Sequence, residues 1–334
     1  MEHILVVSTT GLGDCLWGTP ALRALKKSFP EAQLDFLVNA KWQSLFDNNP
    51  HIDRLIGWGH LWYRLLPLGL KLKLNTFSYD AILIFHSHRT FRRLLPFVRY
   101  STIWYHQTFD WIPKRFQIRF NGYTHSIKKR FALLEKIGAR PDGSQMEIFF
   151  TNKDRERTNT YLKEIKFFEG EYVYLNIGAS LGHKQWPEDR FIGLAQRIIE
   201  KTSLNIVLGG GDGDKIRSRR IAKHLDISRV ADACDNPIQV NAGLISQARL
   251  MLTTDTGPMH IALALKVPTV ALFGPTRASE SGPYEIPENL CKVIQSPLAG
   301  SVPPAGRGNK DYFFNPITVN MVWEEVQKKL SYGF

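Results

Sequence analysis

The 334-residue sequence has few cysteines and no long apolar run. Its three cysteines, Cys15, Cys234 and Cys291, are far apart. This spacing indicates neither a zinc site nor a disulfide framework and favours a reducing compartment. The leucine-rich stretch 61–74 is interrupted by charged residues, proline and glycine, so it is too short and too polar to span a bilayer. The apolar run Ile4–Val7 is shorter than a signal peptide requires, and we expect a cytoplasmic protein.

Several common nucleotide-binding and catalytic motifs are also missing. The glycine-rich segment 11–16 has Leu16 where a dinucleotide-binding fingerprint has its third glycine, and segment 209–214 fails in a similar way. There is no P-loop lysine motif and no Gly-x-Ser-x-Gly elbow. His, Cys and acidic residues do not stand at metal-ligand spacing, so we expect no metal. These absences disfavour NAD binding, ATP hydrolysis and serine-hydrolase chemistry.

The positive charge of the chain is unevenly distributed. Residues 1–167 contain 25 Lys and Arg against 14 Asp and Glu, whereas residues 168–334 contain 18 against 17. Nucleic acid, anionic lipid, a phosphorylated substrate or a merely solvated basic face would each account for such an excess. The basic half lacks a recognised nucleic-acid-binding motif, so we expect no nucleic acid partner.

The two halves of the chain begin with the same pattern. The apolar run Ile4–Val7 leads into the small-residue loop 8–14, and Tyr172–Ile177 leads into the loop 178–184. Further strand candidates (34–38, 81–85, 205–208, 249–253 and 268–273) alternate with helical segments (16–28, 127–137, 190–201 and 215–225), which predicts parallel α/β sheets. We predict two Rossmann-like domains, 1–167 and 168–334, with the carboxyl ends of their strands facing a central cleft. A last helix is predicted near 318–330, and packing of this helix on the first domain is one alternative.

The segment Asp255–His260 is the most informative part of the sequence. Gly257 permits a tight turn, and Pro258 suits the first turn of a helix, where its missing N–H costs nothing. The free N–H groups and the helix dipole at such a turn favour a diphosphate. The alternative is an ordinary strand-to-helix connection capped by Thr256, with His260 as a structural residue.

Charged residues in other loops are candidates for catalysis or ligand binding. Asp14, where the first loop meets its helix, is placed to take a proton from a sugar hydroxyl, although Asp is also a common helix cap. Lys184, in the corresponding loop of the second half, is placed to neutralise a leaving diphosphate, although most loop lysines are simply solvated. Either Asp212 or Asp214, beyond the strand candidate 205–208, is placed to bind ribose hydroxyls.

In their order along the chain these motifs resemble glycosyltransferase family 9, the ADP-heptose:lipopolysaccharide heptosyltransferases. The motifs are the loop 8–14, Thr19–Leu22, His183–Pro187, Gly209–Gly211, Asp255–His260 and Phe273–Thr276. The resemblance implies the GT-B fold, with the donor on the C-terminal domain and the acceptor on the N-terminal one. It also implies inverting, metal-independent transfer of a heptose from an ADP-sugar, expected to be ADP-heptose, to a lipopolysaccharide inner-core acceptor.

The same resemblance assigns roles to individual residues. It implies that Asp14 is the general base and that Lys184 contacts the donor diphosphate. The implied donor site comprises Gly13, Gly209, Asp214, Asp255, Thr256, Gly257, Pro258 and His260. Acceptor contacts are chosen from charge alone and are Arg64, Arg89, Arg92 and Arg93.

The expected partners are the nucleotide-sugar and a lipid-linked anionic glycan. The basic first half then suits a peripheral contact with the anionic inner face of the inner membrane, and we expect a monomer. Two alternatives remain open. One is a family member that uses another nucleotide-sugar or glycan acceptor. The other is a non-catalytic glycan-binding protein, against which the presence of Asp14 and Lys184 argues.

Overall fold

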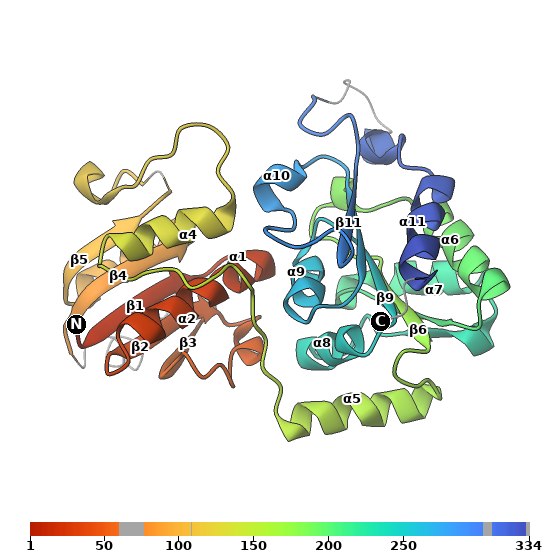
Figure 1. The fold of residues 1–334 in the computed structure, drawn as a ribbon, viewed down its shortest axis with the longest axis horizontal. Coiled ribbons are helices and arrows are strands. Elements are labelled where there is room, and N and C mark those ends of the chain that lie inside the picture. The colour runs from red at the N-terminus through yellow and green to blue at the C-terminus, as the bar shows by residue number, and fades with distance from the viewer. Residues whose placement is uncertain (60–76, 108, 303–308, 332–334) are drawn as a thin grey trace. The chain divides into compact units, whose positions relative to one another are not determined.

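The computed structural model describes residues 1–59, 77–107, 109–302 and 309–331. The chain forms two compact units, Met1–Phe149 and Phe150–Phe334 (Figure 1). Each unit is built on one sheet of parallel strands with helices packed on it, as the alternation of strand and helix patterns predicts. Among the described residues, no helix combines the length and apolar character needed to cross a membrane.

The first unit has a five-stranded sheet in the order β3-β2-β1-β4-β5. The strands are β1 His3–Ser8, β2 Gln33–Asn39, β3 Arg54–Trp58, β4 Tyr79–His86 and β5 Tyr100–Tyr105, and the helices are α1 Leu12–Leu16, α2 Thr19–Ser28 and α4 Ser126–Glu135. The chain builds outward from β1 in one direction and then crosses back to β4 on its other side. Ligands of such sheets bind at this reversal, outside the carboxyl ends of the two central strands.

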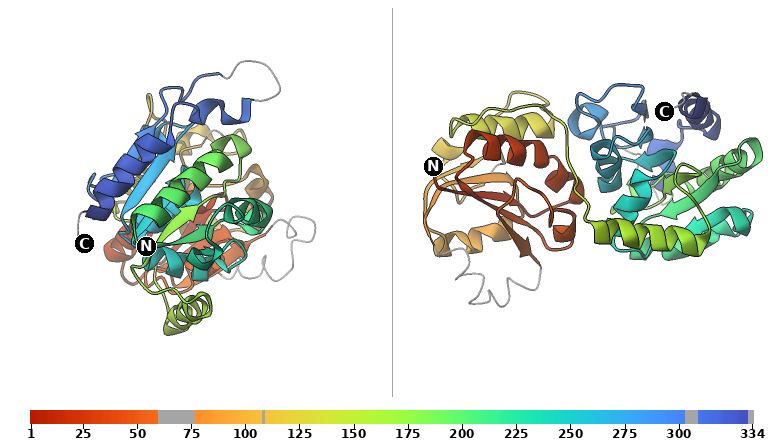
Figure 2. Two further views of the ribbon diagram at one scale, coloured as in Figure 1. Left: turned by 90° about the vertical axis from the view of Figure 1, so that its right-hand side faces the viewer. Right: turned by 60° about the horizontal axis from the view of Figure 1, so that its bottom comes forward.

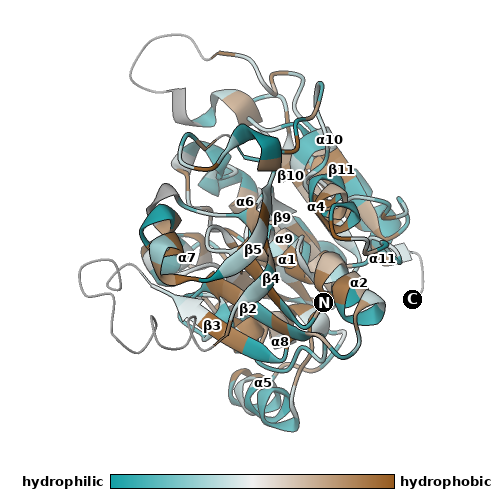
Figure 3. Cartoon of the chain, turned by 90° about the vertical axis from the view of Figure 1, so that its left-hand side faces the viewer, coloured by the Kyte–Doolittle hydropathy of each residue, from teal (hydrophilic) through white to brown (hydrophobic). Residues whose placement is uncertain are grey.

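The central strands of the first unit are apolar through their middle. In β1 every residue from Ile4 to Ser8 is buried, and Ile4 is in register with Leu34 of β2 and Ala81 of β4. Continuous burial is expected of a parallel strand with both faces covered. Figure 3 shows the contrast between the largely hydrophobic residues of these strands and the mostly hydrophilic residues of α5, Asn152–Ile165.

The second unit has a six-stranded sheet in the order β11-β10-β9-β6-β7-β8. Its strands are β6 Tyr172–Asn176, β7 Asn205–Gly209, β8 Val230–Asp232, β9 Leu250–Thr254, β10 Thr269–Phe273 and β11 Cys291–Gln295. Its helices are α5, α6 Glu188–Lys201, α7 Lys215–Ala222, α8 Ile238–Ser246, α9 Gly257–Ala264, α10 Ala278–Ser281 and α11 Val319–Ser331. This is the strand order of a dinucleotide-binding fold, with the reversal between β6 and β9.

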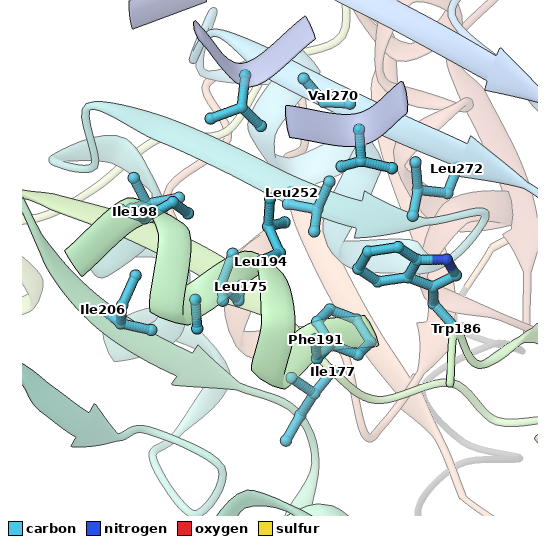
Figure 4. Close-up of a cluster of buried hydrophobic side chains, with 14 of the residues drawn as sticks. Leu175, Ile177, Trp186, Phe191, Leu194, Ile198, Ile206, Leu252, Val270 and Leu272 are labelled. Atoms are coloured by element: carbon cyan, nitrogen blue, oxygen red, sulfur yellow. The ribbon is translucent and has the colours of Figure 1, made fainter. Parts of the chain in front are cut away.

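The core of the second unit lies between its sheet and α6. Phe191, Leu194 and Ile198 recur on one face of α6 and pack with Trp186 over the central strands (Figure 4). The indole N–H of Trp186 donates to the Ile317 carbonyl at 3.2 Å, which satisfies the polar atom of this buried ring. Helix α11 adds Val322 and Val326 to the same core, so these two side chains are buried in its own unit.

Helix α5 belongs to the second unit. Thr151 caps it in a reciprocal pair with Asp154, in which each side chain accepts a hydrogen bond from the other residue's N–H, at 3.1 and 2.9 Å. Its few buried side chains pack on α8, beside which it runs (Figure 1, Figure 2). The division between the units therefore falls after Phe149, earlier in the chain than the boundary predicted after residue 167.

Candidate active site

The first group of predicted residues lies where β1 meets α1. Gly11 has an extended backbone (φ −68°, ψ 160°) and turns the chain from the strand into the helix. Its N–H lies 3.2 Å from Oδ2 of Asp14, and the Thr10 hydroxyl donates to the same oxygen at 2.8 Å. Gly13 is the residue before Asp14 in this first turn. The side chain of Asp14 is 21% exposed, so the carboxylate is held by the loop and still accessible.

His86, which the sequence analysis did not single out, lies beside this carboxylate. It is the last residue of β4, the strand across the reversal from β1. Its Nδ1 is 2.7 Å from the Thr10 hydroxyl and 3.8 Å from Asp14 Oδ2. Burial lowers the pKa of His86 below its usual 6.5, the charge of Asp14 opposes this shift, and Arg130 and Lys129 reinforce it. His86 is therefore neutral at physiological pH.

Arg130 of α4 is a second unpredicted neighbour of Asp14. Its guanidinium is 1% exposed and donates to the Ser126 carbonyl at 2.7 Å and to the Asp14 carbonyl at 2.9 Å. Nη2 lies 3.8 Å from Asp14 Oδ1. Burial lowers the pKa of Arg130 to about 10, with Asp14 opposing the shift, so this side chain remains a cation at neutral pH. It supplies a fixed positive charge beside the candidate base.

The second group of predicted residues lies at the corresponding end of the other sheet. Lys184 Nζ donates to Asp255 Oδ2 at 2.7 Å, and Asp255, only 7% exposed, directly follows β9. The same carboxylate accepts from the Thr276 hydroxyl at 2.6 Å and from the Ser281 hydroxyl at 3.2 Å. Asp255 thus accepts from the loop after β6, the loop after β10 and the end of α10, and it fixes the position of the lysine amine.

The start of α9 is held against β6 by Asn176. The amide of Asn176 donates to the hydroxyls of Thr253 and Thr256 at 3.2 and 3.1 Å. Thr256 precedes α9 without capping it, and Gly257 and Pro258 form the first turn. His260 is 2% exposed, and its neighbours Met259 and Ile261 are fully buried. The N-terminal turn of α9 therefore stands beside Asp255 at the reversal of the sheet, where diphosphates bind in such folds.

The loop after β7 is shaped by glycines. A Cβ on Gly209 would lie 2.0 Å from Tyr174 Oη, so this position accepts only glycine for packing reasons. The carboxylate of Asp214 accepts from the Gly211 N–H at 2.9 Å, and its Oδ2 would be 2.1 Å from a Cβ at Gly178. Asp214 therefore closes the loop after β7 against the loop after β6.

Arg217 of α7 is a further residue that the sequence analysis missed. It is 6% exposed and donates to Gln185 Oε1 at 2.6 Å and to the Trp186 carbonyl, so it anchors the segment that follows Lys184. His86 and Asn176 both end β-strands at the carboxyl edge, and that position is the signal by which they could have been found. Arg130 and Arg217 lie in polar helices, where a buried arginine has no sequence signature.

The arginines chosen as acceptor contacts are only partly described. Arg92 and Arg93 are exposed in the short 3-10 turn Arg89–Arg93 that follows β4. Arg89 lies in the same turn, and Arg64 lies outside the described residues. Within the described part of the chain, no three His, Cys, Asp or Glu side chains gather closely enough to hold a metal ion.

Comparison with known proteins assigns the fold and the family. The family model described as "Glycosyltransferase family 9 (heptosyltransferase)" matches residues 76–299. The curated lipooligosaccharide heptosyltransferase 2 of Haemophilus ducreyi is 24% identical over 315 residues, covering 88% of this chain and 90% of that protein.

Solved structures share the two parallel sheets and their helices. A family 9 glycosyltransferase from Veillonella parvula superposes with a TM-score of 0.83 at 20% identity, covering 98% of this chain and 97% of the other. The E. coli heptosyltransferase WaaC with ADP has a TM-score of 0.75 at 18% identity, covering 98% of this chain and all of that one. The predicted GT-B fold class is confirmed by these structures. The chain belongs to glycosyltransferase family 9, the heptosyltransferase family, and is a glycosyltransferase.

Proposed function

We propose that this protein transfers a heptose from ADP-heptose to an inner-core lipopolysaccharide acceptor, inverts the anomeric centre and needs no metal. The names of its relatives and the ADP bound to one structural neighbour support the choice of donor and acceptor. The observation that carries the mechanism is the pair Lys184–Asp255 at the start of α9, together with an accessible carboxylate, Asp14, held by its own loop.

The donor half of the proposal uses the second unit. The N-terminal turn of α9, with Thr256, Gly257 and Pro258, offers N–H groups and a positive dipole end to the diphosphate. Lys184 adds a positive charge, and Asp255, which accepts from three protein donors, acts on the donor substrate by holding Lys184 in place. Gly209 and Asp214 border the ribose, and His260 supports the helix from within the core.

The acceptor half uses the first unit. Asp14 Oδ1 takes the proton of the acceptor hydroxyl while that oxygen forms its bond to the anomeric carbon. The bond from this carbon to the diphosphate oxygen breaks, and its electron pair leaves with ADP. The charge that grows on ADP is offset by Lys184 and the α9 dipole. A single displacement of this kind inverts the configuration, and it needs only these protein charges.

The remaining parts of the proposal concern the acceptor and its setting. The basic first unit suits a phosphorylated, lipid-linked glycan on the cytoplasmic face of the inner membrane, with Arg64, Arg89, Arg92 and Arg93 as candidate contacts and the protein acting as a monomer. The double variant Arg92→Gln/Arg93→Gln should then raise the acceptor KM and leave the donor KM unchanged. A matched double variant in the second unit, Lys153→Gln/Arg157→Gln, removes the same charge from the exposed face of α5.

The decisive experiment is transfer by the purified protein, followed by mass spectrometry. ADP-heptose is compared with ADP-glucose, UDP-glucose and GDP-mannose on a heptose-free lipid-linked acceptor, with and without EDTA, and NMR gives the anomeric configuration of the product. We expect ADP-heptose to be used at an EDTA-independent rate and Asp14→Asn to lose about 100- to 10,000-fold in kcat. Preference for another donor would assign the alternative substrate. Tight donor binding without any turnover would favour the non-catalytic glycan-binding protein.

A further inference from the structure

We propose that Thr10 and His86 are positioning residues that orient the carboxylate of Asp14. His86 is hydrogen-bonded to the Thr10 hydroxyl, and the Thr10 hydroxyl is hydrogen-bonded to the carboxylate. This proposal rests on the proposed role of Asp14 as the general base. It adds two residues that never need to touch the substrate, one from the β1–α1 loop and one from the end of β4.

The donor and acceptor of each hydrogen bond between His86, Thr10 and Asp14 follow from the number of protons available. The Thr10 hydroxyl has one proton, and two acceptors compete for it, Asp14 Oδ2 at 2.8 Å and His86 Nδ1 at 2.7 Å. An ionised carboxylate accepts only, and it forms the stronger, charge-assisted bond. The proton of Thr10 therefore points to Asp14. The Thr10 oxygen then accepts from Nδ1–H of a neutral His86, which fixes the tautomer of that ring.

This arrangement gives the two carboxylate oxygens of Asp14 different roles. Oδ2 is held by the Thr10 hydroxyl and by the Gly11 N–H at 3.2 Å. Oδ1 lies 3.8 Å from the buried guanidinium of Arg130. Oδ1 is therefore the oxygen offered to an acceptor hydroxyl, and rotation of the carboxylate away from that position would break the bonds to Oδ2.

Neutral His86 also protects the basicity of Asp14. The charged or titratable groups that face its ring are Asp14 on α1, Arg130 and Lys129 on α4, and His106 directly after β5. Protonation of His86 would put a second cation beside Asp14, 3.8 Å from Oδ2, and stabilise the carboxylate against taking a proton. Because burial, Arg130 and Lys129 lower the pKa of His86, the loss of basicity at Asp14 is confined to pH values below 6.5.

The test compares four variants of the full-length enzyme. Thr10→Val removes the hydroxyl and keeps the shape of the side chain. His86→Ala removes the imidazole that donates to Thr10. Each should lower kcat by about 10- to 100-fold, since misplacement of a reacting group by about 1 Å costs about 100-fold, while the donor KM stays unchanged. Thr10→Ser and His86→Gln keep a hydroxyl and an N–H donor, and both should recover kcat to within about threefold of wild type. Melting temperatures and ADP binding identify any variant that is merely misfolded.

The pH profile separates positioning from a purely structural role. In His86→Gln no cation forms beside Asp14 as the pH falls, so the acid limb of kcat should move to lower pH than in wild type. A structural residue would leave the position of that limb unchanged. An unchanged acid limb in His86→Gln, or wild-type kcat in folded Thr10→Val, overturns the proposal.

A double-mutant comparison keeps this proposal separate from the role of Asp14 itself. If Asp14 is the base and Thr10 acts through it, Thr10→Val should cost nothing further in an Asp14→Asn background. If Asp14→Asn alone retains wild-type kcat, the proposed function of Asp14 fails. If Asp14→Asn is inactive and Thr10→Val is fully active, only the positioning proposal fails.

Discussion

Lys184 is the residue whose charge the donor half of the mechanism needs most. Lys184→Ala should raise the donor KM and lower kcat by about 100-fold, because removal of one group that stabilises developing charge typically costs this much. Kinetics with a saturating acceptor measure both parameters. Lys201→Ala, at an exposed position at the end of α6, is the matched control and should behave as wild type. Wild-type kinetics in Lys184→Ala would show that Lys184 only pairs with Asp255 and takes no part in catalysis.

His106 should make the fold sensitive to acid. Burial and the nearby charge of Arg130 lower the pKa of His106 to about 3, and its Nε2–H donates to the Phe85 carbonyl. The unfolded chain, with an ordinary pKa near 6.5, therefore takes up the proton first, and stability is lost as the pH falls from about 6.5 towards 3. One proton is equivalent to about 1.4 kcal/mol per pH unit, so the change from pH 7 to 5 should cost about 2 kcal/mol.

Urea unfolding of wild type and His106→Gln at both pH values measures this contribution. The amide of glutamine supplies a donor for the Phe85 carbonyl and has no proton to gain, so the variant should lose less stability between pH 7 and 5. Equal losses in the two proteins would show that His106 is already accessible to protons in the folded state.

At the scale of secondary-structure elements, three strands of the first sheet are tied together by a buried carboxylate. Asp35 of β2 is fully buried and lies opposite Arg54 of β3 in the strand register. Arg54 Nε donates to it at 3.0 Å, the Tyr79 hydroxyl of β4 also donates to it, and Arg54 Nη2 is 3.0 Å from that hydroxyl. If the carboxylate were removed, Arg54 Nε and the Tyr79 hydroxyl would lose their acceptor.

Asp35→Ala should therefore lower the free energy of unfolding by about 2 kcal/mol, because it leaves the buried Tyr79 hydroxyl without its acceptor and the partly buried Arg54 without its counter-ion. Lys27→Ala is the control in the same unit. Its mostly exposed amine pairs with Asp142 at 2.7 Å, and such surface pairs contribute about 0–1 kcal/mol. Urea unfolding of the full chain compares the two. Similar losses from both substitutions would mean that the Asp35 cluster relaxes or hydrates when it is broken.

The elements that sequence predicted are those whose pattern is determined locally. The central strands, such as β1 and β9, are continuous apolar runs, and the amphipathic face of α6 has helical spacing. The strands β3, β5, β8 and β11 were missed because edge positions are shorter or mix polar residues with apolar ones. Helix α8 was missed because Gly243 interrupts it. A Cβ there would lie 2.0 Å from Thr158 Oγ1 of α5, a contact that no local pattern reveals.

At the scale of the whole molecule, the sequence indicated which loops follow the central strands better than it indicated the contacts within those loops. The loops at the two strand reversals were predicted from Asp14, Lys184 and the Asp255–His260 segment, because small and charged residues after apolar strands mark carboxyl edges. The pairing of Lys184 with Asp255, and of Thr10 with His86, depends on which strands are neighbours. The order of strands in a sheet follows from the whole fold, so the sequence around one residue of a pair could not reveal its partner.

The charge of the molecule is also concentrated in one structural unit. Residues 1–149 contain 20 Lys and Arg against 11 Asp and Glu, whereas residues 150–334 contain 23 against 20. The imbalance predicted for the two halves of the sequence therefore holds when the chain is divided at the structural boundary. We expect the first unit to bind anionic membrane reversibly, because basic residues near an anionic surface contribute about 1 kcal/mol each and are screened by salt.

Co-sedimentation with liposomes tests this contact across a salt series. Wild-type protein should bind vesicles rich in anionic lipid at low salt, release them as salt is raised, and leave neutral vesicles unbound. Arg92→Gln/Arg93→Gln should weaken the binding about 30-fold, the equivalent of about 2 kcal/mol, because both side chains are exposed. The matched variant Lys153→Gln/Arg157→Gln removes equal charge from α5 and should stay within about twofold of wild type. Equal weakening by both variants would show attraction by net charge alone, and equal binding to neutral vesicles would rule out an electrostatic contact.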